Sequence, residues 1–245
     1  MINLRPEDTI HKSYLNRLLI EIGDNPQLSQ VLAFKGGTCA SMLGFLDRFS
    51  VDLDFDLCKK TNELVIRKEL RQIFDYLSLE VKKEFDNVLM FQVQYPNAPN
   101  KRNTIKISIN SLIVKANEYK VQYFPEIDRL MNSQTIETMF ANKLVAIMDR
   151  YNNHQTIAGR DIYDVHHFFV NGYSYSKPVI KERTGEDPEI YFKKLAEFIK
   201  DKVTQTMINE DLNTLLPERQ FQSIRKVLIP ETLSFLTKEQ RQNIQ

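Results

Sequence analysis

The sequence Phe34-Lys-Gly-Gly-Thr-Cys-Ala-Ser-Met-Leu-Gly-Phe-Leu-Asp-Arg-Phe-Ser-Val-Asp-Leu-Asp-Phe-Asp56 carries the strongest structural signals of this 245-residue chain. Its pattern predicts a buried strand that ends near Phe34, a glycine turn, and a helix over residues 38–46. A loop and a second strand over residues 51–57 follow. A glycine pair therefore opens a helix, and an acidic strand comes shortly after it.

The glycine turn Lys35-Gly-Gly-Thr38 lies between the first predicted strand and the helix. Without a Cβ atom at Gly36 or Gly37, backbone amides can approach a phosphate group closely. The N-terminus of the helix adds N–H groups that lack helical partners, together with a partial positive charge. The turn is therefore a candidate phosphate site. The alternative is a tight strand-to-helix turn in which Thr38 caps the helix.

The acidic ladder of the second strand consists of Asp52, Asp54 and Asp56, with Leu53 and Phe55 between them. Alternate residues of a strand lie roughly 6–7 Å apart on one face, and carboxylates at this spacing can share Mg²⁺. Three carboxylates in a row repel one another unless a cation is bound. The ladder predicts a metal site, and the alternative is the solvated face of an edge strand. A phosphate site beside a metal site is what nucleotidyl transfer requires.

The remainder of the first half of the chain mixes helical and strand patterns. Apolar spacing predicts helices over residues 7–22 and 61–79. Residues 88–95 and 104–114 have strand patterns and are joined by a turn-rich loop, which predicts a β-hairpin. Residues 120–124 could add a short strand.

The second half of the chain has helical patterns throughout. Helices are predicted over residues 135–151, 160–171, 187–202, 206–216 and 217–245. The expected fold is therefore of the α+β class: a mixed sheet with flanking helices, followed by a helical domain. We expect the two domains to span residues 1–130 and 131–245.

The composition is that of an ordinary globular protein. Hydrophobic residues make up 42% and charged residues 27% of the chain, and the formal net charge is +1. The overall charge therefore does not indicate a nucleic-acid ligand, although basic pairs such as Lys82-Lys83 and Lys101-Arg102 could contact RNA or form a solvated face. Cys39 and Cys58 lie in apolar segments, which is typical of a reduced protein. We find no signal-peptide or membrane-spanning pattern and expect a cytoplasmic protein without a membrane partner.

Two parts of the central stretch resemble a known family. Lys35-Gly-Gly-Thr38, followed by Arg48-Phe-Ser-Val-Asp-Leu-Asp54, is similar to the signature of AbiEii/AbiGii-type nucleotidyltransferase toxins. These toxins belong to the DNA polymerase β-like nucleotidyltransferase superfamily. The family also carries a lysine on a later helix and then an Arg-Asp-x-x-Asp segment. Asn142-Lys143-Leu and Arg160-Asp-Ile-Tyr-Asp164 match both in type and order. The resemblance covers about residues 30–170.

The resemblance implies a nucleotidyltransferase-like fold and a set of functional residues. The implied nucleotide-binding residues are Lys35, Gly36, Gly37, Thr38, Arg48 and Ser50. The implied Mg²⁺ ligands, with Mn²⁺ as an alternative metal, are Asp52 and Asp54, with Asp56 as a further candidate. The implied catalytic residues are Asp52, Asp54, Lys143, Asp161 and Asp164, the last three from the helical domain that would complete the cleft.

The resemblance also implies substrates and partners. The substrate would be an NTP, and the acceptor of the nucleotide would be an RNA, tRNA above all, or a protein. The chain would act as the toxin of a toxin–antitoxin or abortive-infection pair, with a cognate antitoxin as partner.

One departure from the superfamily keeps other functions open. Members with the full polymerase-like mechanism have a third carboxylate on a later strand, but here Lys106, Ser108 and Asn110 occupy the polar face of that strand. Asp56 could take the role of the missing acid. Otherwise the chain could be a nucleotide-binding module with weak or no catalysis. A metal-dependent nuclease is a third possibility.

The later motif residues also have structural alternatives. Lys143 could be a lysine at the edge of an apolar helix stripe that extends its amine to solvent. Asp161 could serve only to favour the dipole at the start of its helix. His166 and His167 have no further ligand at a metal-binding spacing, so we expect them to be structural or surface histidines.

Overall fold

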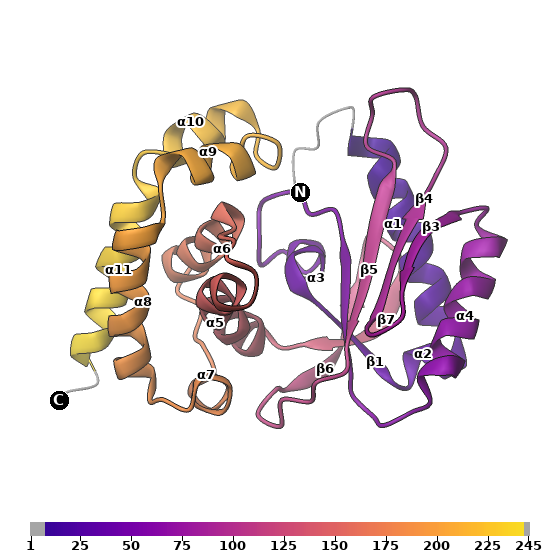
Figure 1. Cartoon of the computed structure of the whole chain (residues 1–245), viewed down its shortest axis with the longest axis horizontal. Helices are drawn as coiled ribbons and strands as arrows, with labels where there is room; N and C mark the ends of the chain where they lie inside the picture. Colours follow the sequence, from indigo (N-terminus) through magenta and orange to yellow (C-terminus); the bar gives the residue numbers. More distant parts are fainter. Residues whose placement is uncertain (1–7, 243–245) are drawn as a thin grey trace. The chain divides into compact units, whose positions relative to one another are not determined.

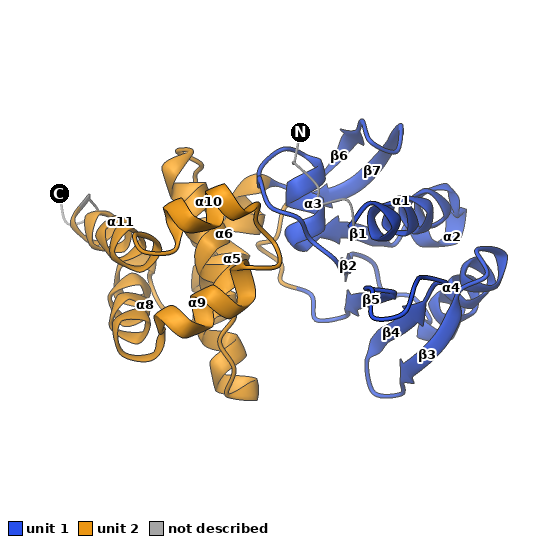
Figure 2. Ribbon diagram, turned by 90° about the horizontal axis from the view of Figure 1, so that it is seen from above, with its two compact units in different colours: residues 1–113, 119–135 blue, residues 114–118, 136–245 orange. Residues whose placement is uncertain are grey.

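A computed structural model describes residues 8–242, and residues 1–7 and 243–245 lie outside the description. The chain forms two compact units (Figures 1 and 2). The first comprises Met1–Ile113 and Tyr119–Thr135, and the second comprises Val114–Glu118 and Ile136–Gln245. The expected boundary at residue 130 lies inside the first unit, because the chain enters the second unit once at Val114 and again at Ile136.

The first unit is built on a seven-stranded mixed sheet with the order β3-β4-β5-β2-β1-β7-β6. The strands are β1 (Leu32–Lys35), β2 (Leu53–Leu57), β3 (Glu80–Phe85), β4 (Leu89–Gln94), β5 (Thr104–Asn110), β6 (Tyr119–Phe124) and β7 (Arg129–Gln134). β2 lies in the middle of the sheet, antiparallel to β1 and parallel to β5. The predicted hairpin of β4 and β5 is confirmed, because the two strands pair antiparallel.

Four helices accompany the sheet. They are α1 (Thr9–Asp24), α2 (Pro26–Ser29), α3 (Gly36–Met42) and α4 (Glu63–Tyr76). α1, α2 and α4 lie on one side of the sheet and α3 on the other (Figure 2). The apolar residues of the strands face the three-helix side, where Phe34 contacts Phe55 and Phe74 contacts Phe91 with ring centroids 5.3 and 5.4 Å apart. The polar residues of β2 are consequently on the face that carries α3.

The second unit is helical, as predicted. Its helices are α5 (Ile136–His154), α6 (Gly159–Val170), α7 (Lys177–Thr184), α8 (Pro188–Lys202), α9 (Gln205–Leu212), α10 (Glu218–Ile224) and α11 (Leu228–Gln242). Its core contains Phe140 of α5, which contacts Phe168 and Phe169 of α6 at ring-centroid distances of 5.1 and 4.8 Å. α11 packs on both α6 and α8.

The α+β fold class is confirmed, but several boundaries differ from the prediction. α2, β3, β7 and α7 have no counterpart in the sequence-based prediction. The single helix expected over residues 217–245 is interrupted after Ile224, and its last three residues lie outside the described part, as does residue 7 of the predicted first helix. The strand expected from Val51 begins at Leu53, because side chains bind the carbonyl oxygens of Val51 and Asp52.

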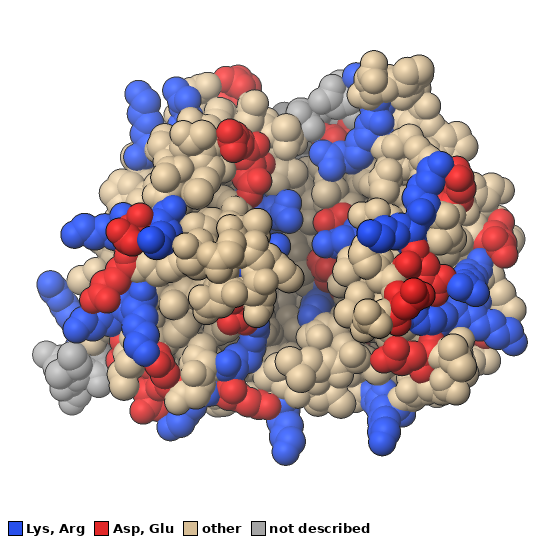
Figure 3. All heavy atoms as spheres, viewed as in Figure 1, with Lys and Arg blue, Asp and Glu red and all other residues tan. Residues whose placement is uncertain are grey.

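The surface charges agree with the small net charge of the chain. On the face seen in Figure 3, acidic and basic side chains are interspersed. Within residues 8–242, no helix is long and apolar enough to cross a membrane.

Candidate active site

The glycine turn packs directly against the acidic strand. Gly36 has a φ of +79°, which L-residues with a Cβ atom rarely adopt. A Cβ atom at this position would lie only 2.8 Å from Oδ2 of Asp54. The register of the sheet explains the contact, because Lys35 of β1 is opposite Asp54 of β2. Glycine is therefore required at position 36 both by the backbone conformation and by the carboxylate of Asp54.

Gly37 makes a second close approach, to the loop that precedes β2. A Cβ atom here would lie 2.8 Å from Nη2 of Arg48 and 2.9 Å from Oγ of Ser50. Arg48 is only 2% exposed, and its Nη1 donates a hydrogen bond to the carbonyl oxygen of Phe49 at 3.0 Å. The predicted nucleotide-binding residues Gly36, Gly37, Arg48 and Ser50 are thus neighbours in one small region.

Asp52 lies just before β2, and its backbone is held by side chains. The hydroxyl of Thr38 donates a hydrogen bond to the carbonyl oxygen of Asp52 at 2.5 Å. Nε2 of His11 is 2.8 Å from the carbonyl oxygen of Val51. The Asp52 side chain is 28% exposed and has the Lys106 amine 3.9 Å away. In this structure Thr38 therefore positions the candidate metal ligand Asp52 through its backbone.

His11 is a site residue for which the sequence offered no signal. It is fully buried, and burial lowers its pKa below the usual 6.5 despite the hydrogen bond to Val51. Because a carbonyl oxygen only accepts, Nε2 of His11 donates to Val51, and Nδ1 lies 2.7 Å from the Tyr95 hydroxyl. The Tyr95 hydroxyl donates to the carbonyl oxygen of Arg102 at 2.7 Å, and this oxygen also accepts from the Asn97 side chain at 2.6 Å. His11 thus ties α1 to the residue before Asp52.

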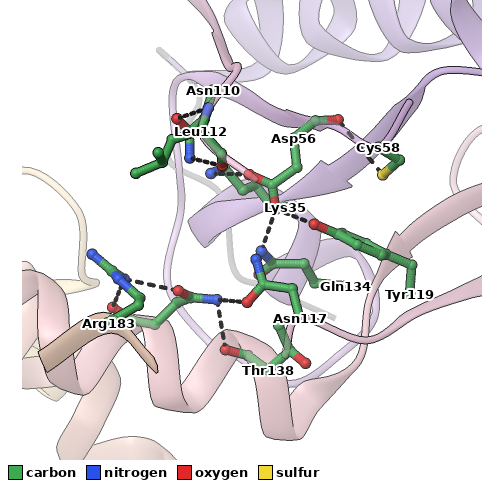
Figure 4. Close-up of polar contacts among 11 residues, drawn as sticks. Lys35, Asp56, Cys58, Asn110, Leu112, Asn117, Tyr119, Gln134, Thr138 and Arg183 are labelled. Carbon is green, nitrogen blue, oxygen red and sulfur yellow. Dashed lines mark hydrogen bonds and ion pairs between the residues drawn. The ribbon is translucent and has the colours of Figure 1, made fainter. Parts of the chain in front are cut away.

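Asp56 is buried, unlike Asp52. It is only 2% exposed, and its Oδ1 accepts from the Lys35 amine at 2.5 Å. Its Oδ2 accepts from Nε2 of Gln134 at 2.6 Å and from the Tyr119 hydroxyl at 3.1 Å (Figure 4). These contacts from β1, β7 and β6 favour a structural role for Asp56 over the metal-binding role that the sequence analysis expected. They also supply the basic partner that the acidic ladder lacks in sequence.

The strand beside the acidic ladder has the polar face expected from the sequence. Ser108 of β5 is opposite Asp54, and Asn110 is opposite Asp56. Asn110 uses its side-chain oxygen to accept from the backbone N–H of Leu112 at 3.1 Å. No Asp or Glu therefore stands on β5 next to the candidate metal ligands.

A pair of carboxylates beside a candidate phosphate-binding turn is a suitable site for Mg²⁺. This ion binds oxygen ligands and is often held by one or two carboxylates plus the phosphates of a substrate, with waters completing its shell. Asp52 and Asp54 are of this ligand type, and the absence of a Cβ atom at Gly36 lets the Asp54 carboxylate lie directly against the turn. Among the described residues, no group of three or more His, Cys, Asp or Glu side chains is arranged to hold a metal ion.

The second unit contains a separate charged cluster, formed by α5 and α6. The Lys143 amine lies 2.7 Å from Asp161 and 2.8 Å from Asp164. Both aspartates are buried, at 1% and 0% exposure, whereas the Lys143 side chain is 18% exposed. Arg150 adds a further contact to Asp161 at 3.1 Å. Lys143 is therefore held in place by two carboxylates and does not simply extend to solvent.

The protonation of Asp161 follows from these neighbours. Burial alone would raise the pKa of its carboxyl group, because it penalises the charged form. The charges of Lys143, Arg150 and Arg160 outweigh burial and lower the pKa to about 2. Asp161 is consequently ionised at neutral pH, and its role is larger than favouring the dipole of α6.

Next to Lys143, Asn142 belongs to a polar network within the second unit. Its side chain donates to Asn117 at 3.0 Å and to the carbonyl oxygen of Thr138 at 3.0 Å. Arg183 of α7 donates to Oδ1 of Asn142 at 2.8 Å and pairs with Asp149. In the motif Asn142-Lys143, the amide of Asn142 therefore has a structural role, and the amine of Lys143 is held by two aspartates.

The two histidines after Asp164 have structural contacts, in line with the sequence analysis. His166 is buried, and its Nε2 lies 2.7 Å from Glu231 of α11. His167 stacks on Tyr163, with ring centroids 6.0 Å apart. Neither histidine contributes to a cluster of possible metal ligands in the described part of the chain.

The predicted site residues thus form two groups, one in each unit. Residues 35–38, 48–56 and the facing strand β5 are brought together in the first unit. Lys143, Asp161 and Asp164 are brought together in the second.

Comparison with known proteins identifies a family model and solved structures that match this chain. A family model described as "Nucleotidyl transferase AbiEii toxin, Type IV TA system" matches residues 17–239. No curated protein matches the chain. Among solved structures, a proposed nucleotidyltransferase from Helicobacter pylori is 22% identical with a TM-score of 0.60, covering 98% of this chain and 97% of its own. The JHP933 protein of H. pylori is 23% identical with a TM-score of 0.58, covering 99% and 97%. These two structures share the fold with this chain.

Proposed function

The chain belongs to the AbiEii nucleotidyltransferase toxin family of type IV toxin–antitoxin systems, and on this premise we propose that it transfers a nucleoside monophosphate from an NTP to an acceptor. The acceptor in this proposal is an RNA, with tRNA the first candidate, and a protein acceptor is the alternative. The transfer would disable the acceptor and stop growth, as expected of the toxin of a toxin–antitoxin or abortive-infection system that is paired with an antitoxin.

The observation that carries this proposal is the contact between Gly36 and Asp54. A carboxylate at 2.8 Å from the Cβ position of a glycine with positive φ leaves no room for a larger residue. The start of α3 and the Asp54 carboxylate are therefore close together, and Thr38 of α3 binds the backbone of Asp52. A triphosphate needs both features, since N–H groups bind its oxygens and carboxylates bind its accompanying cation.

In the proposed reaction, Asp52 and Asp54 hold Mg²⁺, or Mn²⁺ in its place. When bound, this ion would neutralise charge on the triphosphate and favour loss of a proton from the attacking hydroxyl. Gly36, Gly37 and Thr38 contribute backbone amides to the phosphates, and buried Arg48 and half-buried Ser50 pack against Gly37 of the turn. Asp56 holds the amine of Lys35, a residue that is opposite Asp54 in the sheet.

Lys143 has a different part in the proposal. Its amine stabilises the negative charge that develops on the phosphates during transfer. Asp161 and Asp164 fix the position of this amine, and the low pKa of Asp161 keeps that carboxylate charged at neutral pH.

The missing acid on β5 supports a second candidate function. Ser108 and Asn110 stand where a third carboxylate would be expected, next to Asp54 and Asp56. A protein of this fold with two metal ligands could bind an NTP and turn it over weakly or not at all. Both candidate functions include nucleotide binding, and they differ in whether the bound NTP is turned over.

Incubation of the purified protein with total RNA and each radiolabelled NTP in turn tests the proposal. We expect label to enter RNA only when Mg²⁺ or Mn²⁺ is present. Asp54→Asn should reduce incorporation by about 10²-fold or more, because it removes one of two metal ligands with little change in shape. Asp75→Asn, which makes the same change at an exposed position of α4, is the matched control and should keep full activity.

Two results would contradict the transferase proposal. Binding of NTP and Mg²⁺ in calorimetry without release of pyrophosphate on any acceptor would favour the inactive module. Shortening of labelled RNA, in place of its extension, would indicate a nuclease.

A further inference from the structure

The polar face of the acidic strand continues over three neighbouring strands. Asp52 contacts Lys106 of β5, Lys106 is opposite Gln92 of β4, and Gln92 is opposite Lys83 of β3. Directly paired residues in a sheet point to the same face. These four side chains therefore form a row that begins just before β2, crosses β5, β4 and β3, and extends ~14 Å from the carboxylate, given a strand spacing near 4.8 Å.

A second row runs parallel to the first. Asp54 is opposite Ser108, Ser108 is opposite Met90, and Met90 is opposite Phe85. The amine of Lys83 lies 4.3 Å from the ring centroid of Phe85, as expected when both side chains are on one face. The part of the two rows beyond the carboxylates is called the open face below, and it consists of Lys83, Phe85, Met90, Gln92, Lys106 and Ser108.

The open face contrasts with the other side of the same strands. Phe91, Val93 and Ile107 are 0% exposed, and α4 packs on their side of β3 and β4 (Figure 2). On the open face, Lys83 is exposed and the Lys106 side chain is 37% exposed. An aromatic ring and a methionine thus lie among polar side chains on a surface that retains access to solvent.

The charges of the open face favour an anionic ligand. Lys83 and Lys106 supply two cations. Glu84 of β3 points to the other face, where it pairs with Arg67 and Arg71. Glu80 is opposite Gln94, on the same face as Gln92, and its charge is paired with Lys82 at 2.8 Å.

We propose that the open face binds the single-stranded end of an RNA acceptor and leads it to the carboxylates. Lysines bind the phosphates of single-stranded RNA, an aromatic side chain stacks on a base, and amides such as that of Gln92 bind base edges. The row begins at Asp52, so a strand lying on it ends with its terminal hydroxyl at the candidate metal ligands. This inference rests on the proposed function for the choice of RNA.

Binding of a short fluorescein-labelled single-stranded RNA, measured by fluorescence anisotropy without NTP, tests the inference. Lys83→Gln should weaken binding about 5-fold and reduce the slope of log K against log salt concentration by about 0.7, because one phosphate contact is lost. Phe85→Leu should weaken binding about 5-fold or more without a change in slope, because it removes a stacking surface and no charge.

The controls separate the open face from general charge effects and from misfolding. Lys68→Gln removes the same charge from an exposed position of α4, on the other side of the sheet, and should leave RNA binding unchanged. Circular dichroism and thermal melting should show that all three variants remain folded.

Three outcomes would overturn the inference. The first is wild-type affinity in both Lys83→Gln and Phe85→Leu, and the second is no RNA binding by the wild type. The third is binding of a poly-glutamate peptide that requires Lys83 but not Phe85, which would assign the face to an acidic protein. Because the assay contains no NTP, it is independent of turnover. Nucleotide transfer to a protein without RNA binding would refute this inference and leave the transferase proposal intact.

Discussion

Gly36 and Gly44 have almost the same backbone conformation but very different surroundings. Their φ angles are +79° and +78°, so an alanine at either position would be strained to a similar extent. A Cβ atom at Gly36 would collide with the carboxylate of Asp54, whereas at Gly44 it would meet nothing within 4 Å. At the scale of the residue, alanine variants at these two glycines therefore distinguish the effect of backbone strain from the effect of damage to the candidate site.

We therefore predict different outcomes for the two alanine variants. Gly44→Ala should lower the free energy of unfolding by about 1 kcal/mol, because it places a Cβ atom at positive φ, and Gly36→Ala should lower it by at least as much, because its Cβ atom also meets Asp54. Only Gly36→Ala should also lose affinity for NTP with Mg²⁺, since it displaces the Asp54 side chain. Urea unfolding and calorimetry measure the two effects. Equal nucleotide affinity in both variants would show that Asp54 and the turn do not form one binding site.

Individual site residues differed in how far they could be predicted. Asp52 and Asp54 follow from their alternation with apolar residues, which is a local pattern. The contacts of His11 could not be predicted, because its partners Val51 and Tyr95 are 40 and 84 residues away in the chain. The same holds for Asp56, whose partner Gln134 is 78 residues distant. Local patterns carry no information on such pairs.

The strands also differed in how well the sequence predicted them. β2 was predicted to within two residues at its start because one face is apolar and the other acidic. β3 was missed because it is an edge strand that reads Glu80-Val-Lys-Lys-Glu-Phe85 and buries little apolar surface. β7, which reads Arg129-Leu-Met-Asn-Ser-Gln134, was missed because its buried residues include Ser133 and Gln134. Burial of polar residues removes the alternation on which strand prediction depends.

At the element scale, the pairing of α5 with α6 through Lys143 and Asp161 predicts a pH dependence. The folded-state pKa of Asp161 is about 2, below the reference value of 3.8. A lowered carboxyl pKa stabilises the fold at every pH above the unfolded value, and this contribution is lost as the pH falls from 3.8 through 2. The loss should amount to about 2 kcal/mol.

Urea unfolding between pH 6 and pH 2 measures this contribution. Asp161→Asn should be less stable than wild type at pH 6, and the difference between the two should shrink as the pH approaches 2. Asp201→Asn, at an exposed position of α8, is the control and should follow the wild-type curve. A stability difference between wild type and Asp161→Asn that is constant over this range would contradict the assigned pKa.

At the scale of the whole molecule, neither unit is a single continuous stretch of the chain. Val114–Glu118 leaves the first unit between β5 and β6 and joins the second. There Glu182 of α7 accepts hydrogen bonds from the backbone N–H groups of Lys115 and Ala116, at 2.8 and 2.7 Å. A boundary drawn from composition at residue 130 could not show this, because the five residues have no helical pattern of their own.

The position of β7 gives a prediction about truncated chains. A fragment of residues 1–130 lacks most of β7, whereas one of residues 1–135 contains it. β7 lies between β1 and β6 in the sheet, pairs with β6 along its whole length, and provides Gln134 for buried Asp56. The shorter fragment would therefore leave β6 without a partner and the Asp56 carboxylate without one of its donors, which destabilises a buried charge.

We expect the 1–135 fragment to give the circular dichroism of a folded α+β protein and to resist limited proteolysis. The 1–130 fragment should be degraded at low protease concentration. The longer fragment with Gln134→Ala should lie between the two, because it keeps the pairing of β7 and loses only the hydrogen bond to Asp56. Equal resistance of both fragments would mean that β1 to β5 form a stable sheet by themselves. The first unit would then end before β6, and Tyr119 and Gln134 would be dispensable partners of Asp56.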